Sequence, residues 1–417
     1  MILAQAFSRF AFDLDGVVWK GDRPIAGAPD TIRTLRDAGK RIVFVTNNSS
    51  ETHEAYAKKL AEMGAGGSPD EVVSSADATA RLLERSVPGL RGRLAYVVGG
   101  EGLLNAVAGV GARIAFEEDG KDASLVVVGW DRGLTFDKLR LATLAVRAGA
   151  VFVASNTDAT YPAQEGMWPG AGAIVAALRT STGVEPMVAG KPDPGVFQVA
   201  RERLGGSPAL VVGDRVETDI MAAHAAGWPA ALVLSGATGV PELAAAPAWP
   251  DFILGRLTDI LEDRPHPQVR PAAGPDLPHI ATMLHHGGLI AGAARERVGR
   301  TMVAEADRKP IATASWEHID GVGLLRSVAV SPEYRRSGAG TIIVAATLKR
   351  MIEEGVREVY LVTENAERFF AACGFRVIDR DQLPQAIAKH PQLVRECPAS
   401  APAMYLRMPA MQAGASQ

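Results

Sequence analysis

The chain has 417 residues, and at about 150 residues per domain this length indicates two or three domains. It carries 44 basic and 47 acidic side chains, a net charge of −3, so no basic excess is available to hold a nucleic-acid backbone. Two cysteines exclude a disulfide scaffold and any all-cysteine metal site within one chain. We therefore expect a globular cytoplasmic protein that does not bind nucleic acid.

Neither a signal peptide nor a membrane span is expected. The start, MILAQAFSRFAFDLD, lacks a basic stretch followed by a long apolar run. Residues 220–241 contain no Asp, Glu, Lys or Arg, but Gly227, Pro229 and Pro241 divide them into short apolar runs. Such runs are typical of a helix end, a buried strand and a loop.

Over the first 260 residues, short apolar runs alternate with helix-length segments such as 29–38. This alternation predicts a parallel α/β sheet with crossover helices, in which ligands bind beyond the carboxyl ends of the strands. The runs expected to be strands are 10–14, 41–45, 94–98, 125–128, 151–154, 209–212 and 230–234.

A proline-rich stretch, EDRPHPQVRPAAGPD, begins at residue 262 and indicates a domain boundary. The order of elements then changes to a second α/β unit with an antiparallel start. We expect a strand near Val269, a helix over 277–286, strands at 302–306, 311–316 and 324–330, a helix over 341–354 and a strand at 358–362.

Polar side chains follow several strands of the first part. Asp13 and Asp15 come directly after the first strand, where two carboxylates can attack, transfer protons or bind a cation. Taken alone, this pair also fits a solvated loop or a helix cap. A cluster beginning at Thr46 ends the second strand, Lys191 lies in a later turn, and Asp214 follows another strand.

This order resembles the haloacid dehalogenase (HAD) superfamily, in particular the NagD-like phosphatases of subclass IIA. The matching stretches are DLDGVVWKG, FVTNNSS, AGKPDP, VGDRVETDI and, for an inserted cap, SNTDATYPAQEGMWPGAGAIVAAL. The resemblance implies a Rossmann-like α/β core formed by residues 1–80 and 184–264, with an inserted α/β cap at 81–183.

The resemblance also assigns roles to individual residues. Asp13 would attack phosphorus and form an aspartyl-phosphate, and Asp15 would protonate the leaving oxygen and then activate water. Thr46 and Lys191 would hold phosphoryl oxygens, with help from the backbone N–H of Asn47. Ion-pumping relatives carry a threonine where Asp15 stands, and the cap motifs differ from those of phosphomutases, so we expect a hydrolase.

A magnesium ion is implied by the same resemblance. Asp13, Asp214 and the backbone carbonyl of Asp15 would bind it, with Asp219 in support. Carboxylates suit this hard cation, and its charge offsets the repulsion between an attacking carboxylate and a phosphate.

Substrate choice is expected to depend on a cap loop over residues 156–170, which contains Tyr161, Gln164, Glu165 and Trp168. The two aromatic side chains would bind substrate, although ordinary packing of the cap would explain them as well. Relatives include phosphatases for phosphoglycolate, glycerol phosphate, pyridoxal phosphate, nucleotides and nitrophenyl phosphate, and the sequence does not decide among these substrates. Our expectation is a small aliphatic phosphomonoester.

The second part contains a glycine-rich turn between a strand and a long helix. Backbone N–H groups at such a turn can approach a pyrophosphate, and the helix dipole favours the anion. The stretches SVAVSPEYRRSGAG and NAERFFAACGFRV resemble the GNAT N-acetyltransferases over residues 265–408, and the ending resembles a group of arsenic-resistance acetyltransferases. A frayed tail is expected at 409–417.

The GNAT resemblance implies that acetyl-CoA binds here. The backbone of Val328 and Val330 would pair with the pantetheine arm. The pyrophosphate would lie in a cradle formed by Arg335, Arg336, Gly338, Ala339, Gly340 and Thr341.

The chemistry of this half is less well marked than its cofactor site. Phe370 replaces a tyrosine that acts as general acid in many members, and Glu317 and Glu364 are the nearest bases, though each also fits a surface carboxylate. Cys373 is expected in the core, and Cys397 would face the acceptor or pack.

Two interpretations remain open. In the first, a Mg²⁺-dependent phosphatase is fused to an acetyltransferase that acts on a small amine. In the second, the phosphatase carries an inactive GNAT-like module that binds acyl-CoA, regulates the enzyme or forms a homodimer.

Overall fold

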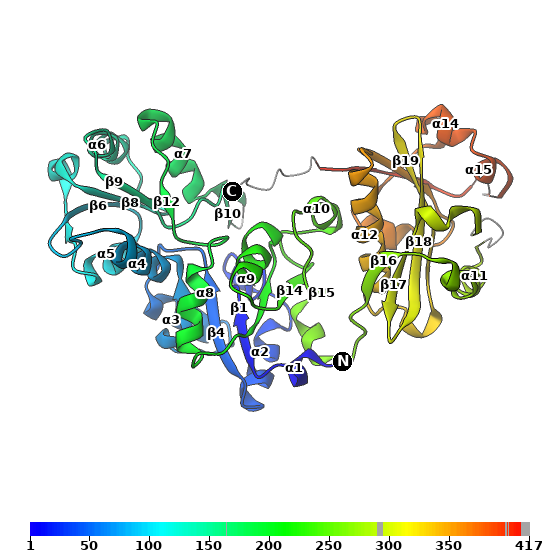
Figure 1. The fold of residues 1–417 in the computed structure, drawn as a ribbon, viewed down its shortest axis with the longest axis horizontal. Helices are drawn as coiled ribbons and strands as arrows, with labels where there is room; N and C mark the ends of the chain where they lie inside the picture. Colours follow the sequence, from blue (N-terminus) through cyan, green and yellow to red (C-terminus); the bar gives the residue numbers. More distant parts are fainter. Residues whose placement is uncertain (164, 290–294, 397, 399, 410–417) are drawn as a thin grey trace. The chain divides into compact units, whose positions relative to one another are not determined.

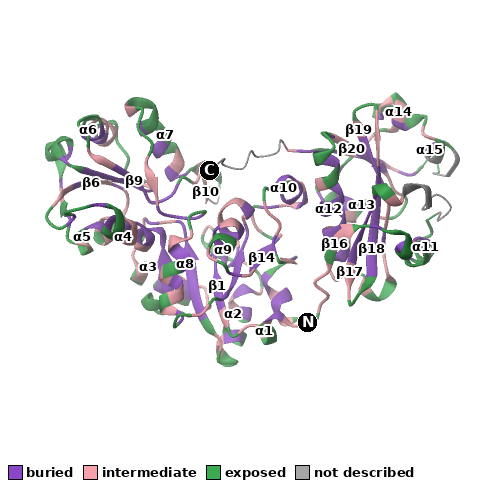
Figure 2. Ribbon diagram, in the orientation of Figure 1, coloured by how far each residue is buried: buried purple, intermediate pink, exposed green. Residues whose placement is uncertain are grey.

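The chain forms two units in a computed structural model, which describes residues 1–163, 165–289, 295–396, 398 and 400–409. The N-terminal unit comprises Leu3–Gly236 and Arg256–Leu261. The C-terminal unit comprises Met1–Ile2, Ala237–Gly255 and Glu262–Gln417. Figure 2 shows that the strands of both units are largely buried, whereas the outer faces of the helices are exposed.

A parallel sheet forms the core of the N-terminal unit. β1 (Arg9–Phe12) pairs with β4 (Arg41–Thr46) on one side and with β13 (Leu210–Gly213) on the other. β5 (Val72–Ser74) continues the sheet beyond β4, and β14 (Ala230–Val233) continues it beyond β13. Because parallel strands end at the same edge, the residues that follow β1, β4 and β13 come together there.

Helices flank this sheet (Figure 1). In α2 the buried positions Thr31, Ile32 and Leu35 recur at helical spacing, so one face packs inward. α3 begins at a cap in which the Thr52 side chain accepts the N–H of Ala55 at 3.2 Å. The core helices are α1 (Leu3–Ala6), α2 (Ala28–Asp37), α3 (His53–Glu62), α8 (Gly195–Arg203) and α9 (Met221–Ala225).

A second parallel sheet, of strand order β12-β9-β8-β6-β7, forms the cap. Alternate residues of β8 face opposite sides: Val126 and Val128 pack with α6 and α7, and Leu125 and Val127 pack with α4 and α5. The strands are β6 (Leu94–Val98), β7 (Arg113–Ile114), β8 (Leu125–Val128), β9 (Val151–Ala154) and β12 (Met187–Val188). The helices are α4 (Ser75–Ser86), α5 (Glu101–Gly109), α6 (Phe136–Arg147) and α7 (Ala171–Thr182).

Two short antiparallel hairpins complete the N-terminal unit. β2 (Trp19–Lys20) pairs with β3 (Arg23–Pro24). β10 (Thr160–Ala163) pairs with β11 (Gly166–Pro169) within the segment expected to be a loop, and Tyr161 lies opposite Trp168. This segment is therefore a ribbon that holds these two aromatic residues beside each other.

The C-terminal unit contains a mixed sheet of order β16-β17-β18-β19-β20-β22-β21. Its strands are β16 (Gln268–Pro271), β17 (Thr301–Ala306), β18 (Lys309–Ile319), β19 (Val322–Val330), β20 (Glu358–Val362), β21 (Arg376–Ile378) and β22 (Ala403–Arg407). The longer helices are α11 (Leu277–His286) and α12 (Ala339–Glu353). The shorter elements are α10 (Val240–Ala245), β15 (Phe252–Leu254), α13 (Glu367–Ala372), α14 (Gln385–Ala388) and α15 (Pro391–Glu396).

The expected fold class is confirmed, with a parallel Rossmann-like core and cap followed by a mixed α/β sheet. The expected boundaries of the core, cap and C-terminal domain stay predictions. Most of the expected tail, and Gln164 and Cys397, lie outside the described residues. Among the helices that the structure describes, none has the length and apolar character needed to cross a bilayer.

Candidate active site

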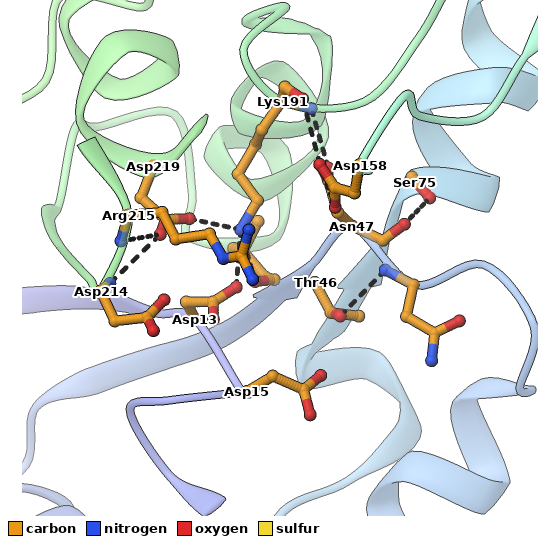
Figure 3. Close-up of polar contacts among 12 residues, drawn as sticks. Asp13, Asp15, Thr46, Asn47, Ser75, Asp158, Lys191, Asp214, Arg215 and Asp219 are labelled. Atoms are coloured by element: carbon orange, nitrogen blue, oxygen red, sulfur yellow. Dashed lines mark hydrogen bonds and ion pairs between the residues drawn. The ribbon is translucent and has the colours of Figure 1, made fainter. Parts of the chain in front are cut away.

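Three buried carboxylates meet at the carboxyl edge of the core sheet (Figure 3). Asp13 follows β1, Asp214 follows β13, and Asp219 lies on the helical turn Val216–Ile220. Each offers a carboxylate oxygen within 4.8 Å of the others. The strand order thus brings together residues that are about two hundred positions apart in the sequence.

Lys191 lies between two of these carboxylates. Its Nζ is 2.6 Å from Oδ1 of Asp13 and 2.6 Å from Oδ1 of Asp219. The other oxygen of Asp219 accepts the backbone N–H groups of Asp214, at 3.2 Å, and Arg215, at 3.0 Å. Both oxygens of Asp219 are thus engaged, and this side chain fixes the loop after β13 and the ammonium group.

The cluster is rich in acidic groups. The site gathers three carboxylates around one ammonium group, and burial raises the pKa of Asp13 while the charge of Lys191 opposes the rise. A divalent cation would lower the repulsion among these carboxylates, and carboxylate oxygens are the donors that Mg²⁺ prefers. Space is kept by Gly16 (φ +85°), where a Cβ would lie 2.0 Å from Oδ2 of Asp214. The residues present therefore fit Mg²⁺.

Asp15 occupies a different environment from Asp13. Its Oδ1 accepts the indole N–H of Trp19 at 3.0 Å, and Lys59 Nζ lies 4.5 Å from the centre of a Trp19 ring. Burial raises the pKa of Asp15, whereas the Lys59 charge and the Trp19 hydrogen bond lower it. A carboxyl group with a raised pKa and an open neighbouring cavity can hold and release a proton.

Thr46 and Asn47 end β4 next to this cluster. The Thr46 hydroxyl oxygen accepts the backbone N–H of Asn48 at 3.1 Å. The Asn47 side chain accepts the backbone N–H of Lys191 at 2.8 Å and donates to the Lys191 carbonyl at 3.0 Å. Both residues are buried beside Asp13 and Lys191.

A cavity of about 580 Å³ opens between Asp15 and the β10–β11 hairpin. Tyr161 stacks on Trp130 with ring centres 4.1 Å apart, and Trp168 donates its indole N–H to Glu165 at 2.9 Å. The lining residues are Asp15, Trp19, Gly21, Asp22, Asn48, Glu51, Ala55, Tyr56, Lys59, Trp130, Arg132, Tyr161, Pro162, Ala163, Glu165 and Trp168. Tyr161 and Trp168 thus lie on the same cavity as Asp15.

Several residues that line the cavity were not predicted from the sequence. Trp19 lies four positions after Asp15, and its place beside the acidic motif was the one usable signal. Lys59 sits on α3 and Trp130 follows β8, so only the packing of α3 and the cap on the core brings them to the cavity. Arg132, whose guanidinium lies 5.4 Å from the centre of a Trp168 ring, had no signal either.

The glycine-rich turn of the C-terminal unit lies between β19 and α12, as expected. Arg336 has a φ of +65° and Gly338 a φ of +93°, so two left-handed residues turn the chain into the helix. Gly338 is the N-cap of α12, and a Cβ there would meet nothing within 4 Å. The first N–H groups of a long helix thus follow an uncrowded turn, an arrangement suited to an anion.

β19 and β20 pair for only a short distance. They are parallel, and their paired positions are Gly323 with Val359 and Leu324 with Tyr360. The part of β19 that contains Val328 and Val330 extends beyond these pairs, and it bulges against β18 near Ser327, whose φ is +52°. Backbone that does not pair with the next strand can accept an extended ligand chain.

The structure shows what surrounds the residues at the expected acid and base positions of this unit. Phe370 is buried and packs edge-on against Phe369 and Phe375, so no hydroxyl stands there. The Glu317 carboxylate bonds to the guanidinium of Arg326 and lies 3.1 Å from Nε2 of His390. Burial raises the pKa of Cys373 to about 12, as befits a core thiol.

Comparison with known families agrees with this geometry. A model described as haloacid dehalogenase-like hydrolase matches residues 10–113, and a HAD-hydrolase-like model matches residues 188–260. A model of the GNAT acetyltransferase family matches residues 261–375. These matches confirm both resemblances, whereas the narrower one to arsenic-resistance acetyltransferases stays a prediction.

Individual relatives are named phosphatases. The chain is 44% identical over 236 residues to the D-glycerol 3-phosphate phosphatase of Mycobacterium tuberculosis, a match that covers 56% of this chain and 65% of the relative. It is 35% identical to phosphoglycolate phosphatase 1A, chloroplastic, of Arabidopsis thaliana, over 63% of this chain and 78% of the relative.

A solved structure of glycerol phosphate phosphatase from Mycobacterium tuberculosis in complex with magnesium matches with a TM-score of 0.67 and 30% identity. The match covers 90% of this chain and 98% of that one. The chain therefore belongs to the haloacid dehalogenase-like hydrolases, among their NagD-like phosphatases, and carries a GNAT domain in its C-terminal part.

Proposed function

We propose that the N-terminal unit is a Mg²⁺-dependent phosphatase for a small aliphatic phosphomonoester of the glycerol 3-phosphate or phosphoglycolate type. The observation that carries this proposal is the placement of Lys191 between Asp13 and Asp219, with Asp214 in the same carboxylate cluster and Asp15 on the adjoining cavity. The names of the relatives support the two substrate types.

Asp13 is the attacking group in this proposal. Its carboxylate oxygen bonds to phosphorus while the bond from phosphorus to the ester oxygen breaks, and Asp15 gives its proton to the leaving alcohol. Asp15 then takes a proton from water, and the water oxygen bonds to phosphorus. The bond from phosphorus to the Asp13 oxygen breaks, so phosphate leaves and the Asp13 carboxylate is restored. Lys191 and Thr46 hold the phosphoryl oxygens during both steps, with the backbone N–H of Asn47.

Asp13, Asp214 and the backbone carbonyl of Asp15 would hold the magnesium ion, with Asp219 supporting the loop and the lysine. When bound, the ion supplies positive charge that reduces the repulsion between the phosphate and Asp13. Tyr161 and Trp168 contact the leaving group from the β10–β11 hairpin.

The substrate assignment is tested by steady-state phosphate release from the purified full-length chain. Glycerol 3-phosphate and phosphoglycolate are compared, with and without Mg²⁺ after treatment with a chelator. We expect Mg²⁺-dependent turnover of at least one ester. Turnover of neither ester, or equal turnover without Mg²⁺, would contradict the proposal.

For the C-terminal unit we propose an acetyl-CoA-dependent N-acetyltransferase that acts on a small amine. The uncrowded turn at Gly338 and the diverging β19 and β20 support cofactor binding. Phe370 favours the alternative, a module that binds acyl-CoA for regulation or dimerisation without transfer. Both activities are placed in the cytoplasm, in keeping with the low cysteine content.

Calorimetric titration of acetyl-CoA into the full-length chain tests the cofactor site. Saturable binding with release of free thiol in the presence of amines supports the transferase, and binding without thiol release supports the regulatory module. Absence of binding would contradict both acyl-CoA roles and leave a structural or dimerisation module.

A further inference from the structure

Both polar atoms of the Asn47 side chain are engaged, by the main chain of Lys191 and by Asp158 of the cap. Its carbonyl oxygen accepts the backbone N–H of Lys191 at 2.8 Å, and its amide nitrogen donates to the Lys191 carbonyl at 3.0 Å. These two bonds hold Lys191 as a neighbouring strand would hold it. The same amide nitrogen lies 3.1 Å from each carboxylate oxygen of Asp158.

The main chain of Asn47 is tied to the cap as well. Its backbone carbonyl accepts from the Asn156 amide at 2.7 Å and from the Ser75 hydroxyl. The Asn156 side-chain oxygen in turn accepts the backbone N–H of Asp158 at 3.1 Å. Asn156 and Asp158 follow β9 of the cap, whereas Asn47 follows β4 of the core. This hydrogen-bond network therefore joins the cap to the core (Figure 3).

Burying the Asp158 carboxylate costs free energy that a side chain serving only to join the cap to the core would not need to cost. Desolvation raises the pKa of Asp158, and the Asn47 amide and the charge of Lys191 oppose this rise. A neutral amide would avoid the cost of burying a carboxylate, but it would offer the Asn47 amide one accepting oxygen in place of the two that lie 3.1 Å away. Asp158 also stands two residues before β10, whose Tyr161 lines the cavity.

We propose that Asp158 is a positioning residue that, through Asn47, couples the place of the β10–β11 hairpin to the place of Lys191. A leaving group that contacts Tyr161 fixes the position of the hairpin, and with it the position of Asp158. Asp158 then accepts from the Asn47 amide, and Asn47 in turn holds the main chain of Lys191, whose ammonium group is thereby positioned. Asp158 itself contacts neither substrate nor metal. The proposal rests on the proposed phosphatase function.

The test compares two esters that differ in reach. Glycerol 3-phosphate has a leaving group long enough to extend into the cavity, whereas methyl phosphate does not. In the wild-type chain we expect a higher kcat for glycerol 3-phosphate. In Asp158→Asn the kcat for glycerol 3-phosphate should fall by about 10- to 100-fold, since small misplacements of a positioning group cost this much. The kcat for methyl phosphate should fall much less.

A double-variant cycle separates coupling from general damage. We call the proposed coupling from Tyr161 through Asp158 and Asn47 to Lys191 the relay. If it exists, Tyr161→Ala and Asp158→Asn each reduce the preference for glycerol 3-phosphate over methyl phosphate, and the double variant shows no larger reduction than either single variant. Additive losses, or an unchanged ratio of the two kcat values in Asp158→Asn, would overturn the proposal. Asp77→Asn, which removes another partly buried carboxylate bonded to His53 and Arg203, is the matched control and should keep the ratio.

Two further outcomes are distinguishable. If Asp158→Asn does not fold, Asp158→Glu retains the charge on a longer side chain, and a ratio intermediate between wild type and Tyr161→Ala is expected. A wild-type ratio in Asp158→Glu would then overturn the relay. Failure of the wild-type chain to hydrolyse glycerol 3-phosphate, phosphoglycolate and methyl phosphate alike would instead overturn the phosphatase itself, and the relay with it.

Discussion

At the scale of single residues, two carboxylates placed two positions apart acquire different properties. Asp13 bonds to Lys191 within a cluster of buried acids, whereas Asp15 bonds to the indole of Trp19 at the cavity. Burial raises the pKa of both, but Asp13 is held by the Lys191 ammonium, whereas Asp15 lines the cavity that would take a leaving group. The two variants that follow test this division of roles.

Asp13→Asn keeps the size of the side chain but removes the attacking oxygen anion. We expect the release of phosphate from glycerol 3-phosphate to fall by about 10³-fold or more, because no equivalent nucleophile remains. The thermal unfolding midpoint, followed by circular dichroism, should change by only a few degrees. Turnover near the wild-type rate would show that another group attacks phosphorus.

Lys59→Met tests the proton on Asp15. The Lys59 charge lowers the pKa of Asp15, so its removal raises that pKa, and Asp15 keeps its proton to higher pH. The alkaline limb of the phosphorylation rate, measured in single turnovers, should move upward by up to about one pH unit. Lys58→Met, an exposed position on the same helix, should leave the limb in place. A limb that stays fixed in Lys59→Met would argue against Asp15 as the acid.

At the scale of elements, the apolar runs predicted most strands of the core and cap because a strand buried on both faces needs a continuous apolar sequence. β5 was missed since it has three residues, and the β10–β11 hairpin was missed because its polar and aromatic residues read as a loop. Motif spacing predicted Asp13, Lys191 and Asp214. No local pattern could predict the contact between Asn47 and Asp158, which depends on how the cap packs.

The turn before α12 offers a prediction at this scale. Gly338 has a φ of +93°, a conformation that costs other residues about 1–2 kcal/mol, and a side chain there would project into the space before the helix. Gly338→Trp should therefore weaken acetyl-CoA binding by at least about 10-fold in calorimetry and leave phosphatase activity unchanged.

Gly355 provides the control for this variant. It follows the other end of α12, has a φ of +87°, and a Cβ there also meets nothing within 4 Å. Gly355→Trp should carry a similar conformational cost without loss of acetyl-CoA affinity. Equal loss of affinity in both variants would indicate general damage to the unit rather than a cofactor site at the turn.

At the scale of the whole molecule, the carboxylate cluster that could hold a metal ion, found among the described residues, lies in the N-terminal unit, so a divalent cation should act unequally on the two units. At 100 times its Kd, Mg²⁺ should add about 2.7 kcal/mol to the unfolding free energy of the N-terminal unit and nothing to that of the C-terminal unit. Differential scanning calorimetry with and without chelator measures both transitions. Asp214→Asn should lose the response, and equal stabilisation of both transitions would contradict the assigned metal site.

The strand order of the core also determines when this enzyme can become active during its synthesis. β1 pairs with β13, and the whole cap is translated between them, so one edge of β1 remains open while the ribosome adds most of the N-terminal unit. Asp13 meets Lys191, Asp214 and Asp219 only after the last of these has left the exit tunnel. A message broken before codon 219 can therefore yield no complete site, whereas one broken after codon 261 still encodes every residue of it.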